Sequence, residues 1–166
     1  MLMSATNFGL HFLSFSKRSF KYYLANDELK LFLSIIFVVV LVSTLTLYMK
    51  EGFSVNDSIR YGFFQSISIV TTTGYTLEPL SGLGGSIGFL IFVLAFIGAC
   101  SGSVGGGMKV WRVLLMLKVG FSNITKIIHP SAVSSVKLNG EKIVSSQIEA
   151  VFSFIAIYVS FFLLFM

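Results

Sequence analysis

An unbroken apolar run at residues 31–48, LFLSIIFVVVLVSTLTLY, constrains the fold of this chain most strongly. The run has 18 residues and no charge. As a helix it would reach about 27 Å, close to the roughly 30 Å hydrocarbon core of a bilayer. Across the 166 residues, 55% are hydrophobic and 11% are charged, against about 25% charged in soluble domains. We therefore predict an all-α integral membrane protein, which excludes an ordinary water-soluble enzyme, a disordered tail and a secreted disulfide scaffold.

Two further apolar stretches indicate additional spans. One is uncharged from residue 79 to residue 108, and another begins after Lys142 and continues to residue 166. Lys and Arg cluster before the first span and after the second, whereas the connecting region holds only Lys50 and Arg60 together with three acidic residues. Because cytoplasmic loops carry an excess of Lys and Arg, both basic flanks are expected inside the cell. That arrangement requires an even number of crossings between them.

The segment between the first two spans must therefore enter the membrane and return on the outer side. Asp57 or Ser58 could cap a short helix through about Val70, some 13 residues or about 20 Å, roughly half a bilayer. The next six residues, Thr71–Thr76, read TTTGYT, and three β-branched residues followed by glycine disfavour a helix. Irregular backbone at membrane depth is tolerated where it is buried in protein or lines a water-filled cavity. The order span, half-helix, extended segment and span predicts a pore-loop architecture.

We call Thr71–Thr76 the filter segment, because its composition suits the binding of dehydrated K⁺. Stacked backbone carbonyls can replace the hydration shell of the ion. Glycine supplies the backbone conformation that such stacking needs, and the carbonyl end of the preceding half-helix favours a cation. Taken alone, the hexapeptide could also be a Thr-rich turn. In this context we predict a K⁺ filter at Thr72, Thr73, Gly74 and Tyr75, with K⁺ held at Thr72 and Thr73.

Several motifs together resemble the Trk/Ktr/HKT superfamily of potassium transporters. Residues 72–75 are similar to the T-x-G-Y of potassium-channel filters, but Thr76 stands where those channels have a second glycine. A single-glycine filter is typical of the superfamily. Within it, four stretches resemble the TrkH/TrkG type of membrane subunit: TNFGLHF at 6–12, SISIVTTTGYT at 66–76, GACSGSVGGGMKVWRVLLMLK at 98–118 and HPSAVSSVKLNGEKI at 129–143.

The resemblance implies a fragment of a four-repeat pore. Members of the family arrange four non-identical span–pore helix–span repeats around one pore, and residues 29–118 resemble the third repeat. The resemblance also implies K⁺ transport without enzymatic chemistry, a homodimer of the full-length subunit, and control by a cytosolic, TrkA-like nucleotide-binding subunit. It suggests the bacterial inner membrane, with the N-terminus of the fragment in the cytoplasm and the filter facing outside. Passive transport and H⁺ or Na⁺ symport both stay open. The alternative is a self-contained, homotetrameric two-span cation channel.

Five glycines within residues 98–107 predict a break in the second span. Each glycine in a helix costs about 1 kcal/mol relative to alanine, so three in a row should interrupt it. We predict an intramembrane gating loop at Gly102, Gly105, Gly106 and Gly107, and the third-repeat inner helix of the family resembles one interrupted in this way. The alternative is close helix packing through the small-residue spacing of Gly98 and Gly102.

Other chemistries find little support in the sequence. The stretch SGSVGGGMK lacks the lysine that directly follows the last glycine of a phosphate-binding loop. No His, Asp or Glu occurs between Glu78 and Met108, so an intramembrane enzyme would lack a base. The net charge of +5 comes from residues that flank apolar blocks, which indicates a lipid bilayer as partner and no nucleic acid. K⁺ is the expected transported ion, and no organic cofactor is expected. Lys109 and Arg112 either anchor the inner helix or line the inner mouth.

The predicted organisation follows from these segments. By residue number it is a cytoplasmic link with an interfacial helix (1–30), a span (31–49), a re-entrant pore helix and filter (57–76), an inner helix interrupted by the glycine-rich loop (80–118), a cytoplasmic loop (119–142) and a truncated first span of the next repeat (143–166).

Overall fold

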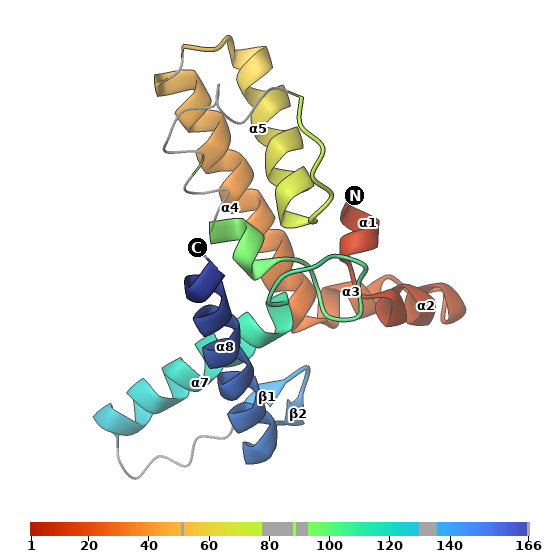
Figure 1. Cartoon of the computed structure of the whole chain (residues 1–166). Coiled ribbons are helices and arrows are strands. Elements are labelled where there is room, and N and C mark those ends of the chain that lie inside the picture. The colour runs from red at the N-terminus through yellow and green to blue at the C-terminus, as the bar shows by residue number, and fades with distance from the viewer. Residues whose placement is uncertain (51, 78–87, 89–92, 130–135, 166) are drawn as a thin grey trace. The chain divides into compact units, whose positions relative to one another are not determined.

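The computed structural model describes residues 1–50, 52–77, 88, 93–129 and 136–165, and the chain is mostly helical (Figure 1). Residues 80–87 and 89–92 of the predicted inner helix lie outside the described residues. The chain divides into two compact units, Met1–Val110 and Trp111–Met166. The first unit contains α1 (Leu2–Ala5), α2 (Phe8–Ser16), α3 (Lys21–Ala25), α4 (Asp27–Lys50) and α5 (Val55–Val70). The second contains nearly all of α7 (Val110–Ile128), then β1 (Lys137–Leu138), β2 (Glu141–Lys142) and α8 (Ser145–Phe165).

Two helices in the described part of the chain are long and apolar enough to cross a membrane, over Asp27–Met49 and Ser145–Phe165. The first helix contains the first apolar stretch identified in the sequence, and the second helix contains most of the third. The first begins at the polar residues ahead of Leu31, because Asn26 caps it: the Asn26 Oδ1 accepts a hydrogen bond from the Leu29 amide at 2.9 Å. Asp27 and Glu28 then fill the first turn, where carboxylates are favourable.

The short helix α5 lies along α4 in the first unit (Figure 1). The two backbones approach closely at Gly62, where an added Cβ would stand 2.6 Å from the Thr44 Oγ1 and 2.9 Å from the Thr44 nitrogen. Nearby, the buried Ser66 hydroxyl donates to the Ser43 hydroxyl oxygen at 3.1 Å. Small and hydroxyl-bearing residues join helices in this way inside membranes. Buried apolar residues of both helices belong to one core cluster, which also includes Ala99: Phe32, Ile36, Val39, Ile67 and Val70.

The N-terminus of α5 differs from the sequence expectation, whereas its C-terminus at Val70 agrees with it. The cap is Ser54 rather than Asp57 or Ser58. The Ser54 Oγ accepts from the Asp57 amide at 3.2 Å and donates to the Asp57 carboxylate at 2.7 Å. A cap and an acidic residue three positions later satisfy each other in this way, which explains the earlier start.

Residues 119–142, expected as a loop, contain regular structure in both of their described parts. Helix α7 continues to Ile128, and β1 pairs with β2 in a small antiparallel hairpin that the all-α prediction lacks. Asn139 and Gly140 connect the strands with φ values of 49° and 87°. A two-residue hairpin turn with positive φ at both positions strongly prefers Asn-Gly, which explains the hairpin.

Candidate functional site

The filter segment begins in the turn that ends α5. The Thr72 amide donates to the Ile69 carbonyl at 2.9 Å, and the Thr73 amide donates to the Ser68 carbonyl at 2.8 Å. This pair of bonds defines a Schellman motif, whose left-handed residue is usually glycine. Here that residue is Thr72, with φ of 54°. A β-branched residue in this conformation costs on the order of 1–3 kcal/mol and persists only where its surroundings hold it.

The remaining predicted filter residues lie on exposed, irregular backbone. Gly74 has φ of 79°, so the special conformation expected of this glycine is present. Thr73, Gly74 and Tyr75 are all exposed, and Tyr75 keeps 67% of its surface. Thr72 to Tyr75 therefore lie consecutively after the carbonyl end of a helix, where a cation is favoured.

The glycine-rich segment, defined here as residues 98–109, separates the helical residues 93–97 from α7 and contains no helix. Gly98, Gly102 and Gly107 have φ values of 71°, 66° and 83°. Gly98 and Gly102 thus lie outside any helix, and small-residue helix packing does not apply to this pair. The helix break extends beyond Gly105–Gly107, over the whole segment.

The first half of the glycine-rich segment is fastened to the N-terminus of the chain. The Cys100 amide donates to the Ala5 carbonyl at 3.0 Å, and the Val104 amide donates to the Ser4 carbonyl at 3.2 Å. In return the Phe8 amide donates to the Gly102 carbonyl at 3.1 Å. Figure 1 shows the green segment beside the N-terminal helices. These backbone bonds fix residues 100–104 as a short irregular strap.

Two charged residues add to this support. The buried Glu28 carboxylate accepts a hydrogen bond from the Ser101 amide at 2.5 Å. The Lys109 ammonium donates to the Ser103 carbonyl at 3.4 Å and also to the Gly105 carbonyl. Lys109 therefore holds the loop itself, a role that neither expectation for this residue included. Arg112, in the second unit, places its guanidinium 3.9 Å from the centre of the Phe154 ring.

The second half of the segment contacts the filter segment. The Gly106 amide donates to the Thr72 Oγ1 at 2.8 Å. A Cβ added at Gly105 would stand 3.3 Å from both the Thr71 carbonyl oxygen and the Thr72 Oγ1, and would overlap the Cβ of Ala99. Residues 105–107 are here called the tip, which fits closely against the filter segment at Gly105 because that residue lacks a side chain.

Sequence reasoning found both segments but missed the residues that hold the second one. Ser4, Ala5, Asn7 and Glu28 lie far from residue 100 in the chain, and no local spacing connects them. Asn7 carries one readable signal: it is a strong N-cap residue, and its Oδ1 accepts from the Gly9 amide at 2.8 Å at the start of α2. Its side chain also lies against Gly102, where an added Cβ would stand 3.2 Å from it.

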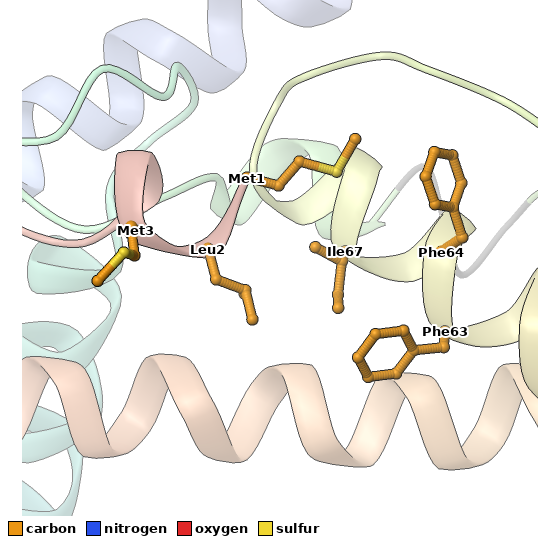
Figure 2. Close-up of a pocket in the computed structure, with 6 residues that line it drawn as sticks. All are labelled: Met1, Leu2, Met3, Phe63, Phe64 and Ile67. Carbon is orange, nitrogen blue, oxygen red and sulfur yellow. The ribbon is translucent and has the colours of Figure 1, made fainter.

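Other parts of the molecule offer less to a cation. Within the described residues, no group of three or more His, Cys, Asp or Glu side chains could hold a metal ion. Figure 2 shows an apolar pocket of about 400 Å³ between the N-terminus and α5, lined by Met1, Leu2, Met3, Phe63, Phe64 and Ile67. None of these side chains carries an oxygen, so the pocket suits apolar groups rather than K⁺.

Comparison with known proteins gives a consistent result. The family model described as TrkH, cation transport protein, matches residues 1–166. The Trk system potassium uptake protein TrkH of Halomonas elongata is 35% identical over 99% of this chain and 34% of its own length. TrkH of Escherichia coli K12 is 37% identical over 95% of this chain and 33% of its own length. The crystal structure of the potassium transporter TrkH from Vibrio parahaemolyticus matches with a TM-score of 0.91 and 34% identity, over 98% of this chain and 36% of that one.

The two apolar helices of spanning length fit a membrane protein, and the fold matches about a third of a solved potassium transporter. Because the family model covers the full sequence, the chain belongs to the TrkH cation transport protein family. It spans about a third of the length of the curated relatives it matches.

Proposed function

We propose that this chain forms one span–pore helix–span repeat, and the first span of the next, in the pore of a Trk-type potassium uptake subunit. The observation that carries the proposal is the filter segment: Gly74 at positive φ, on exposed backbone, after the carbonyl end of a helix packed on α4. The names of the relatives, all potassium uptake proteins, support K⁺ as the transported ion.

The mechanism has two steps along one path. K⁺ loses water at Thr72–Tyr75, where backbone carbonyls and threonine hydroxyls replace the hydration shell. It then passes the glycine-rich segment, whose tip lies against Thr72 and must move aside. Three other repeats supply the remaining sides of the filter. The chain contributes no catalytic group, because the step is dehydration and passage rather than bond chemistry.

The setting of this pore is also part of the proposal. Lys and Arg on both flanks favour a cytoplasmic N-terminus and a filter segment that faces outside. The resemblance to Trk-type subunits supports a bacterial inner membrane. The full-length subunit forms a homodimer and is regulated by a cytosolic, TrkA-like nucleotide-binding subunit. The alternative of a self-contained homotetrameric channel has less support, because the relatives are about three times as long as this chain.

The test is ⁸⁶Rb⁺ uptake in cells that lack their own potassium uptake, with a full-length subunit carrying residues 1–166. Gly74→Asp is expected to abolish uptake while the protein stays in the membrane. Gly52→Asp is the matched control, because Gly52 also has positive φ, 67°, and also has no atom within 4 Å of an added Cβ. Uptake that survives Gly74→Asp would overturn the filter assignment. Uptake by residues 1–166 alone would instead favour the homotetramer.

A further inference from the structure

We propose that the Thr72 hydroxyl is shared between K⁺ and the tip of the glycine-rich segment, so that ion binding and loop closure compete for one oxygen. This inference rests on the proposed function and deepens it. It identifies the side chain that couples ion binding in the filter to the position of the gate.

The three threonine hydroxyls at the end of α5 are engaged differently. The Thr71 hydroxyl donates to the Ile67 carbonyl at 2.7 Å and also lies 2.7 Å from the Thr73 hydroxyl. Since the Thr71 proton is used toward Ile67, the Thr73 hydroxyl donates to Thr71, and this pair is satisfied within the turn. The Thr72 hydroxyl instead accepts from the Gly106 amide, 34 residues further along the chain. Of these three threonines, Thr72 is thus the one whose hydroxyl contacts the tip.

The backbone at Thr72 gives a second, independent reason to look for a role. Glycine would satisfy the Schellman turn without strain, yet a β-branched residue occupies its left-handed position. An outlier of this kind persists where the surrounding structure holds it, and it points to a use for the side chain. In this structure, the contact that uses the side chain is the hydrogen bond from Gly106.

The tip also fits Thr72 sterically. An added Cβ at Gly105 would stand 3.3 Å from the Thr72 Oγ1, and one at Gly106 would stand 3.9 Å from it. With the tip in place, the Gly106 amide directs the positive end of its dipole at this oxygen. A cation at the same oxygen would face that positive end at close range, so K⁺ and the tip oppose each other.

The energetic consequence is reciprocal. If closure of the tip weakens K⁺ binding at Thr72, then K⁺ at Thr72 must favour release of the tip by the same factor. The free energy of one hydrogen bond sets the size of this coupling, which corresponds to about a two- to tenfold change in either equilibrium. High K⁺ at the filter would therefore help to open its own path.

The experiment measures exposure of the tip against K⁺. The full-length subunit carrying residues 1–166 is purified into lipid nanodiscs with Gly106→Cys, a position where an added Cβ meets only ordinary contacts. The rate of reaction with a methanethiosulfonate reagent is compared in K⁺ and in choline at equal ionic strength. The chain without an added cysteine gives the background from the buried Cys100. Gly120→Cys in α7, where an added Cβ meets nothing within 4 Å, is the position control.

We expect K⁺ to raise the rate about two- to tenfold with Thr72 or Thr72→Ser present, and not at Gly120→Cys. In Thr72→Val the rate should be high already in choline, because the tip has lost its acceptor. A low choline rate in Thr72→Val would mean that only K⁺ binding was lost, and it would overturn the proposal. Equal rates in K⁺ and choline with Thr72 present would overturn it as well.

Failure of this inference is distinguishable from failure of the proposed function. If Gly74→Asp abolishes uptake but Thr72→Val leaves the K⁺ effect unchanged, the filter stands and the shared hydroxyl does not. If Gly74→Asp keeps uptake, the filter itself is misplaced. Should Gly106→Cys fail to reach the membrane, Met108→Cys, which is only partly buried, allows the same comparison.

Discussion

The filter segment and the glycine-rich segment are both irregular, yet they are supported in different ways. The filter segment is fixed by its own neighbours: the Thr72 and Thr73 amides return to the last turn of α5. The glycine-rich segment has a local support in Lys109, but it is also bonded to distant residues, Ser4, Ala5 and Glu28. The comparison separates a part that carries its geometry locally from a part whose position also depends on where distant segments lie.

The contact between the two segments is correspondingly small. It consists of the Gly106–Thr72 hydrogen bond and the close fit of Gly105. A small contact can be broken without unfolding either side, which suits a gate. The difference between the two segments can therefore be tested with substitutions that weaken the support of one segment and leave the support of the other intact.

The largest effect is expected where α5, the helix that supports the filter segment, packs on α4. Gly62→Ala places a methyl group against the Thr44 backbone, which cannot yield as a flexible side chain would. We expect α5 to shift on α4, with about 1–3 kcal/mol lost and uptake falling toward background. The thermal midpoint of the purified subunit and ⁸⁶Rb⁺ uptake measure the two effects. Gly120→Ala is the control, and a Gly62→Ala subunit with normal midpoint and uptake would contradict the packing described here.

The next largest effect is expected at the tip, where two neighbouring glycines differ in how closely they are packed. An alanine at Gly105 overlaps the Cβ of Ala99, whereas one at Gly106 stands 3.9 Å from the Thr72 Oγ1. Gly105→Ala should displace the tip and raise uptake about two- to tenfold in cells without the cytosolic regulatory subunit. Gly106→Ala should stay within about twofold of the parent, since no contact tightens below ordinary distance. Equal behaviour of the two variants would argue against the tip as the moving part.

The smallest effect is expected from removing helix caps, because the cap beside the glycine-rich segment and the cap of the helix that supports the filter segment can be removed one at a time. Asn7 caps α2 and lies against Gly102, whereas Ser54 caps α5. Each change to alanine should cost about 1 kcal/mol, visible as a lower thermal midpoint. Only Asn7→Ala should also raise the reactivity of a cysteine at residue 106, because only that cap lies beside the glycine-rich segment. The reverse pattern would count against the distant support.

Local parts of this fold could be predicted from the sequence, and the reason is that their signals are local. The apolar run after Lys30, the end of α5 at Val70 and the special backbone at Gly74 each follow from adjacent residues. The Asn139-Gly140 pair is an equally local signal for a two-residue hairpin, although the charge pattern of this segment alone predicts a loop. Thr72 was predicted as a K⁺ ligand, and its left-handed backbone gave no sign in a run of three threonines.

The support of the glycine-rich segment could not be predicted, because backbone carbonyls carry no residue identity. Ser4 and Ala5 contribute main-chain oxygens that any residue would offer. Glu28 reads as an ordinary acidic residue at a helix start, and only the three-dimensional arrangement brings it to Ser101. The sequence likewise predicted a filter and a loop without indicating that Thr72 and Gly106 meet.

The bonds between the N-terminal segment and the glycine-rich segment also have a consequence for assembly. Ala5 and Cys100 are about 95 residues apart in the chain. Contacts of such long separation carry a high loop-closure entropy and form late, after helices and neighbouring pairs. During synthesis the segment that contains Ala5 must therefore wait until residue 100 has been made. The irregular strap then becomes the last part of this unit to take shape, so a newly made chain would pass through a stage with a formed filter segment and an unbound glycine-rich segment.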